Sequence, residues 1–127
     1  MSLPDLLSAL VAINSINPSL VAGAPGERAL IDFVAHWLRE RGIATEVIAA
    51  GTDVDRPSLL ARVPGHGIGR SLALYAHADT VGLGEAVDAL TPRRVDGRLH
   101  GRGAYDMKGS LAALLRVLEG AALNPLD

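Results

Sequence analysis

The 127-residue chain contains no cysteine, and only 3% of its residues are aromatic. Without cysteine there is no disulfide, no thiolate metal site and no cysteine nucleophile. Lysine is almost absent as well, because Lys108 is the only lysine among the 12 basic residues. The formal net charge of −2 gives no electrostatic reason to expect a nucleic-acid partner or an anionic membrane.

The sequence also shows no pattern of a membrane-spanning helix or of a targeting segment. Residues 6–26 carry no charge, but polar side chains interrupt them at Ser8, Asn14, Ser15, Asn17 and Ser19. A spanning helix needs about 20 predominantly apolar residues. The N-terminus lacks the positive start of a signal peptide. We therefore expect no membrane segment and a cytoplasmic location.

Helical patterns occur near both ends of the chain. Ser2, followed by a proline and an aspartate, is a helix-start pattern, and the next apolar residues follow at helical spacing. A second helix is expected from about Glu27 to Arg41, with Gly42 as its C-terminal cap. A last helix is expected from Lys108 to Glu119, with Gly120 as its stop.

Strand patterns occupy the middle of the chain. Strands are expected at 43–50, 58–63 and 71–76, with the polar loop 51–57 after the first and a brief turn between short strands within 95–99. The glycine-rich residues 64–69 predict a hairpin turn. Residues 71–76 are almost wholly apolar, which is typical of a strand buried on both faces. The order of elements predicts an α/β fold with a sheet covered by helices.

Several common catalytic motifs are absent. The chain has no G-x-S-x-G nucleophile elbow, no H-E-x-x-H zinc helix and no G-x-x-x-x-G-K phosphate loop. Gly101-Arg102-Gly103 begins like a dinucleotide-binding fingerprint, but Asp106 stands where the third glycine belongs. A Rossmann-type nucleotide site is therefore not expected.

His77 and Asp79 directly follow the apolar residues 71–76, at the sheet edge where open α/β proteins bind ligands. In extended backbone their side chains share one face because they are two residues apart. One use of such a pair is a metal-ligating imidazole whose second nitrogen is held by a carboxylate. The other interpretation is a surface histidine beside a loop aspartate.

Asp106 lies in the glycine-rich stretch 101–110, which leads into the expected last helix. The positive end of that helix favours a carboxylate at this place. Asp106 is then either a functional carboxylate or simply the N-cap of the helix, a role worth about 1 kcal/mol.

Together, the two stretches resemble the M20 family of zinc metallopeptidases, which includes acetylornithine deacetylase, succinyl-diaminopimelate desuccinylase and glutamate carboxypeptidase. The resemblance lies in a strand ending in His77-x-Asp79 and, 29 residues after His77, Asp106 within Gly-Arg-Gly-x-x-Asp-Met-Lys-Gly. It implies that residues 1–127 are the N-terminal part of an α/β/α catalytic domain with a mixed sheet flanked by helices. Metal dependence and amide hydrolysis are implied with it.

The resemblance also implies residue roles. His77 would ligate one zinc, Asp106 would bridge two zincs, and Asp79 would belong to the catalytic set as the carboxylate that orients His77. Two such ions, about 3.5–4 Å apart, activate a water for attack on an amide carbonyl. Cobalt or manganese could occupy similar nitrogen and oxygen sites. Arg102 and Lys108 are expected to pack or to brace the loop.

The family's catalytic Glu-Glu pair, its further metal ligands and its inserted dimerisation domain have no counterpart in this sequence. We therefore expect a partial metal site and a chain that is inactive alone. The complete enzyme is expected to be a homodimer that cleaves an amide bond in a small N-acyl amino acid or peptide. The alternative is a non-catalytic α/β scaffold or an interaction module that retains part of the metal site.

Overall fold

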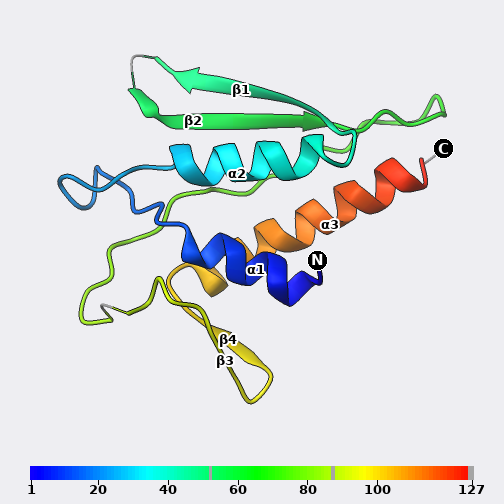
Figure 1. Ribbon diagram of the computed structural model, residues 1–127. Helices are drawn as coiled ribbons and strands as arrows, with labels where there is room; N and C mark the ends of the chain where they lie inside the picture. Colours follow the sequence, from blue (N-terminus) through cyan, green and yellow to red (C-terminus); the bar gives the residue numbers. More distant parts are fainter. Residues whose placement is uncertain (52, 87, 126–127) are drawn as a thin grey trace.

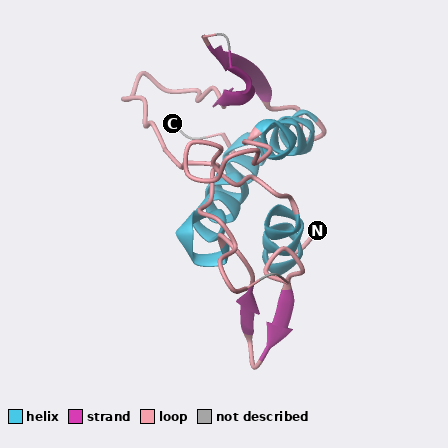
Figure 2. Cartoon of the chain, turned by 90° about the vertical axis from the view of Figure 1, so that its left-hand side faces the viewer, coloured by secondary structure: helices cyan, strands magenta, loops and turns pink. Residues whose placement is uncertain are grey.

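The computed structural model describes residues 1–51, 53–86 and 88–125, which form a mixed α/β structure. Three α-helices are α1 (Leu3–Ala12), α2 (Arg28–Arg39) and α3 (Gly109–Leu123). The strands form two antiparallel pairs, β1 (Ala44–Ala50) with β2 (Asp53–Arg62) and β3 (Arg93–Val95) with β4 (Arg98–His100). Figure 1 shows α2 between the β1–β2 hairpin and the other two helices. Figure 2 shows the two hairpins at opposite ends, with the helices between them.

Helix α1 begins where the sequence predicts. The Ser2 side chain accepts a hydrogen bond from the Asp5 amide at 3.3 Å, and the Asp5 carboxylate accepts one from the Ser2 amide at 3.1 Å. This reciprocal capping box satisfies two amides that a helix N-terminus leaves without partners. The helix ends at Ala12, with Ile13 as its C-cap.

Helices α2 and α3 are confirmed, but both end at other residues than predicted. Helix α2 ends at Arg39 with Glu40 as its C-cap, and the predicted cap Gly42 lies two residues further on, where it has a φ of +72°. Helix α3 does not stop at Gly120 but continues to Leu123, and Asn124 caps it by donating its amide to the Gly120 carbonyl. A glycine weakens a helix by about 1 kcal/mol but does not end it when good helix formers follow. Two alanines and a leucine follow here.

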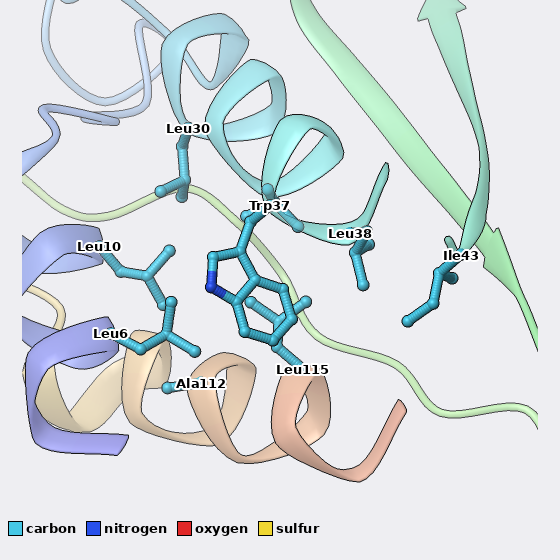
Figure 3. Close-up of a cluster of buried hydrophobic side chains, with 9 residues drawn as sticks. Leu6, Leu10, Leu30, Trp37, Leu38, Ile43, Ala112 and Leu115 are labelled. Atoms are coloured by element: carbon cyan, nitrogen blue, oxygen red, sulfur yellow. The ribbon is translucent and has the colours of Figure 1, made fainter. Parts of the chain in front are cut away.

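The central core joins the three helices. Its buried members are Leu6, Leu10, Leu30, Val34, Trp37, Leu38, Ile43, Ala112 and Leu115. Figure 3 shows the Trp37 indole among leucines that come from α1, α2 and α3. The apolar stripe predicted for α2 therefore faces this core, as helical spacing requires.

The β1–β2 hairpin is longer than the sequence predicts. Strand β1 confirms the expected strand, but β2 already begins at Asp53, inside the expected polar loop. The register pairs Ala44 with Arg62 and Ile48 with Ser58, with an irregularity between Ile48 and Ala50. Cross-strand hydrogen bonding extends the strand through residues whose composition alone indicates a loop.

Residues 71–76 are not a buried strand, and the hairpin expected at 64–69 does not form. Leu72 and Tyr75 are each 82% exposed. Among the described residues, no strand pairs with this segment. An apolar sequence creates the tendency to be buried, but a strand also needs a neighbour that supplies hydrogen bonds. The described strands are therefore two antiparallel pairs, and the expected single mixed sheet is absent from them.

The small β3–β4 hairpin confirms the turn predicted within residues 95–99. Asp96 has a φ of +48° and Gly97 a φ of +73°, the two left-handed positions of a type I′ turn.

No helix in the described part of the chain is long and apolar enough to cross a membrane.

Candidate metal centre

A short parallel backbone bridge holds the segment that carries His77 and Asp79. The Thr80 amide donates to the Ser15 carbonyl, and the Asn17 amide donates to the Thr80 carbonyl, each at 2.9 Å. Thr80 is buried, with 4% of its surface exposed. The segment is therefore fixed against the connection between α1 and α2.

The glycine-rich stretch brings Asp106 to the same place. Gly103 has a φ of +80°, and a Cβ there would lie 2.7 Å from Thr80 Cγ2, so the loop can approach Thr80 only with glycine at this position. The chain then forms the turn η1 (Ala104–Lys108) before α3, and Asp106 and Met107 have non-helical backbone angles within it. This turn places Asp106 beside His77.

The His77 imidazole lies between two carboxylates. Its Nε2 is 2.9 Å from Asp106 Oδ1, and its Nδ1 is 3.1 Å from Asp79 Oδ1. The Asp79 carbonyl oxygen is also 3.1 Å from Nδ1. Burial lowers the pKa of His77, but the hydrogen bond with Asp106 and the charges of both aspartates outweigh it, so the pKa is raised above its usual value.

The three side chains line one cavity of about 470 Å³. Its other lining residues are Thr80, Val81, Gly101, Arg102, Gly103 and Tyr105. The Asp106 side chain is 78% exposed, whereas those of His77 and Asp79 are partly buried. A ligand in this cavity would therefore meet an imidazole and a carboxylate on a surface open to solvent.

The structure excludes the interpretation of Asp106 as the N-cap of the last helix. The N-cap residue of α3 is Lys108, and Asp106 contacts His77 instead of capping the helix. His77 and Asp79 likewise face each other, as their spacing predicts. The proposed roles of His77 and Asp106 as metal ligands, and of Asp79 as the orienting carboxylate, stay predictions.

Lys108 braces the loop, as the sequence analysis expects. Its ammonium group donates to the carbonyl oxygens of Leu10 at 2.9 Å and Ile13 at 2.7 Å, at the end of α1. Burial lowers the pKa of Lys108 to about 8. Arg102 also holds a loop, by donating to the Leu83 carbonyl at 3.1 Å.

Sequence reasoning missed Asn17. Its side-chain amide donates to Asp79 Oδ2 at 2.8 Å, from 62 residues away in the sequence. An Asn-Pro pair after a helix indicates only a helix end and a turn. No spacing pattern links it to Asp79, so the contact becomes visible only once the chain is folded.

The donor set fits part of a metal site. An imidazole nitrogen and a carboxylate oxygen are common zinc ligands, and His77 and Asp106 bring one of each together. Among residues 1–51, 53–86 and 88–125, no group of three histidine, aspartate or glutamate side chains is arranged to hold a metal ion. A catalytic zinc usually has three protein ligands, so the described residues supply two of them.

The chain is similar to a known protein family over the part of the sequence that forms this site. The sequence profile of Peptidase family M20/M25/M40 matches residues 73–126, which contain His77, Asp79 and Asp106. The chain is 32% identical over 117 residues to the acetylornithine deacetylase of Photorhabdus laumondii, covering 90% of this chain and 30% of that protein. It is 36% identical over 128 residues to the acetylornithine deacetylase of Pasteurella multocida, covering 96% of this chain and 32% of that protein.

A second group of relatives carries another name. The chain is 40% identical over 96 residues to the succinyl-diaminopimelate desuccinylase of Methylobacterium radiotolerans, covering 72% of this chain and 24% of that protein. The chain thus spans about a third or less of the length of these relatives. The motif, the family profile and the relatives agree in what the chain resembles: residues 73–126 match peptidase family M20/M25/M40, and the chain is similar to acetylornithine deacetylases and succinyl-diaminopimelate desuccinylases.

Proposed function

We propose that this chain carries the first metal ligands of a metal-dependent hydrolase that cleaves an amide bond in an N-acyl amino acid or small peptide. The observation that carries the proposal is the 2.9 Å approach of His77 Nε2 to Asp106 Oδ1 within one cavity. These two atoms come from segments 29 residues apart, and nothing in a turn or helix cap requires them to meet.

Each residue has a distinct task in this proposal. His77 binds the metal through Nε2, and Asp106 binds through its exposed carboxylate. Asp79 accepts a hydrogen bond from His77 Nδ1–H, which keeps the proton on Nδ1 and leaves Nε2 free as a ligand. When bound, zinc ions activate a water and polarise the amide carbonyl. Lys108 and Gly103 hold the loop that carries Asp106.

The relatives and the cavity support a proposal for the substrate class. The three relatives named above act, by their names, on acylated amino acids: acetylornithine and succinyl-diaminopimelate. The cavity of about 470 Å³ has the size of a small-molecule site. We propose a substrate of the same kind, zinc as the metal, and a cytoplasmic homodimer as the complete enzyme.

Two donors are too few for catalysis by this chain alone. We propose that residues outside the described part complete the metal site, and that the 127-residue chain by itself shows no metal-dependent amidase activity. A scaffold that has lost catalysis would also be inactive as this chain, so the whole protein is the informative material.

The test is hydrolysis of N-acetyl-L-ornithine and related N-acyl amino acids by the whole protein that carries this chain. We expect zinc-dependent hydrolysis, reduced by more than about a hundredfold in both His77→Ala and Asp106→Ala. His36→Ala is the matched control, because His36 is exposed on α2 and pairs with Glu40 at 3.4 Å. Activity that survives His77→Ala, or a whole protein without hydrolysis, would contradict the proposal.

A further inference from the structure

Asn17 reaches the metal centre from the connection between α1 and α2. Its Nδ2 donates to Asp79 Oδ2 at 2.8 Å, whereas His77 Nδ1 lies 3.1 Å from the other carboxylate oxygen, Oδ1. We propose that Asn17 is a positioning residue, which holds the Asp79 carboxylate so that Asp79 orients His77 for metal binding. The inference rests on the metal-binding role proposed above for His77.

The backbone of Asn17 is fixed relative to Asp79. Its amide donates to the carbonyl of Thr80, the residue after Asp79, at 2.9 Å. The Thr80 amide donates to the Ser15 carbonyl at the same distance, so residues 15–17 are tied to the site at two points. The Asn17 side chain therefore starts from a defined position beside the carboxylate.

The orientation of the Asn17 amide is fixed as well. Its Oδ1 accepts a hydrogen bond from the Ser19 amide at 2.8 Å. The reversed orientation would place Oδ1 against the Asp79 carboxylate and Nδ2 against the Ser19 N–H, which replaces two attractive contacts with two repulsive ones. Nδ2 must therefore face Asp79.

The consequence for His77 concerns its ring protons. With Asp79 Oδ2 held by Asn17, Oδ1 lies 3.1 Å from His77 Nδ1. A histidine that ligates through Nε2 carries its proton on Nδ1, and a fixed acceptor there sets both tautomer and ring orientation. Without the Asn17 bond, the Asp79 carboxylate can rotate, and the Nδ1–H form keeps only the Asp79 backbone carbonyl as a fixed acceptor.

Two substitutions separate positioning from a turn-forming role. Asn17→Ala removes both side-chain contacts. Asn17→Asp keeps an oxygen for the Ser19 amide but removes the donor to Asp79 and adds a like charge beside it. Asn14→Ala is the matched control, because Asn14 Oδ1 accepts the Ile16 amide at 3.1 Å in a similar local turn.

The first readout is the zinc affinity of the 127-residue chain, followed through the histidine ring signals in NMR. We expect Asn17→Ala and Asn17→Asp each to weaken zinc binding about tenfold, which is the lower end of the effect typical of groups that hydrogen-bond a metal-ligating histidine. Asn14→Ala should leave the affinity unchanged. In an Asp79→Ala background, Asn17→Ala should cause no further loss, because the two residues act through one contact.

The second readout needs no metal and keeps the two proposals separable. In Asp106→Ala, ring ¹⁵N shifts should show neutral His77 in the Nδ1–H form, and adding Asn17→Ala should move it toward the Nε2–H form. If the tautomer is the same with and without Asn17, the positioning role is wrong. A chain that binds no zinc but shows the tautomer shift would overturn the metal site and support the role of Asn17.

Discussion

Lys108 is the residue that ties the Asp106 loop to the N-terminal helix. It is 1% exposed, and its ammonium group satisfies two carbonyl oxygens at the end of α1. Helix ends leave such carbonyls without partners inside the helix, so a buried cation there serves both packing and hydrogen bonding. Burial of the only lysine at this point also holds the turn that carries Asp106.

Lys108→Met keeps the length of the side chain but removes the charge and both hydrogen bonds. We expect the free energy of unfolding to fall by about 2 kcal/mol, because one buried and one partly buried carbonyl lose a charged donor. Chemical denaturation monitored by circular dichroism measures the change. Arg98→Met, on the exposed β4 strand, removes a charge without such contacts and should have little effect. Equal stabilities of the two variants would contradict the bracing role.

Asp5 gives a pH-dependent contribution at the start of α1. Hydrogen bonds from Ser2 and then from Arg94 lower the pKa of Asp5 from 3.8 to about 2. A carboxylate whose pKa is lowered by folding stabilises the fold above its unfolded pKa, and the contribution is lost as pH falls through the folded value. The contribution of Asp5 should therefore be complete near neutral pH and decline between about pH 4 and pH 2.

Asp5→Asn tests this pH dependence. At pH 7 the melting temperature of the variant should lie below that of the unchanged chain, and the gap should narrow as the pH falls below 4. Asp32→Asn is the control, because the exposed Arg28–Asp32 pair at 3.5 Å contributes little. A gap that stays constant down to pH 2 would show that the capping box acts without the Asp5 charge.

Single residues also show what sequence reasoning can reach. The sequence predicts that the side chains of His77 and Asp79 share one face, because alternation along an extended chain follows from spacing alone, and the two side chains are in contact in the fold. Asn17 was not predicted, because its contact joins residues 62 positions apart through a backbone bridge. Contacts of that kind depend on the folded path of the chain and leave no local pattern.

Among the elements, α2 and α3 are joined by Arg41. Its guanidinium lies 3.6 Å from the centre of the Trp37 ring, Nη1 donates to the Trp37 carbonyl at 2.7 Å, and Nε donates to Glu119 at 2.8 Å. The Arg41 guanidinium therefore stacks on Trp37, caps the end of α2 and pairs with Glu119 at the same time. Lysine offers neither the plane nor the fork of donors.

Arg41→Ala should lower the free energy of unfolding by about 2 kcal/mol, because it removes a stacked cation and a partly buried ion pair. Arg41→Lys should recover only a minor part. Denaturant titration followed by Trp37 fluorescence reports both the stability and the environment of the ring. Full recovery by lysine would mean that charge alone joins α2 to α3.

The elements with local signals were predicted best. A capping box fixed the start of α1, helical spacing identified the buried face of α2, and Asp96-Gly97 identified the β3–β4 turn. Residues 71–76 were predicted wrongly, because strand formation depends on a neighbour that the segment's own composition does not reveal. Gly120 was wrongly predicted to end α3, because a glycine adopts the helical conformation when the residues around it are helical.

Hydrogen exchange checks the account of residues 71–76. Among the described residues, none forms a backbone hydrogen bond with residues 71–76. We expect its amides in the 127-residue chain to exchange at rates near those of an unstructured peptide, while the amides of Val34 and Leu38 in the core face of α2 exchange slowly. Protection of 71–76 equal to that of α2 would mean that the segment pairs with a strand.

At the scale of the whole molecule, the α/β class and the meeting of His77 with Asp106 were predicted, but the arrangement of strands was not. The class follows from periodicities that each segment carries by itself. The strand arrangement depends on pairing between distant segments, and the chain spans about a third or less of the length of its relatives. The cavity nonetheless forms within this length, because the contacts of Thr80, Gly103 and Lys108 all lie inside it.

The central claim is that His77 and Asp106 are metal ligands, and zinc titration of the 127-residue chain tests it most directly. We predict saturable but weak binding, because the described residues supply two donors, with the His77 ring signals responding first. Both His77→Ala and Asp106→Ala should abolish the binding, and His36→Ala should leave it unchanged. No binding by the unchanged chain, or equal affinity in His77→Ala, would contradict the claim.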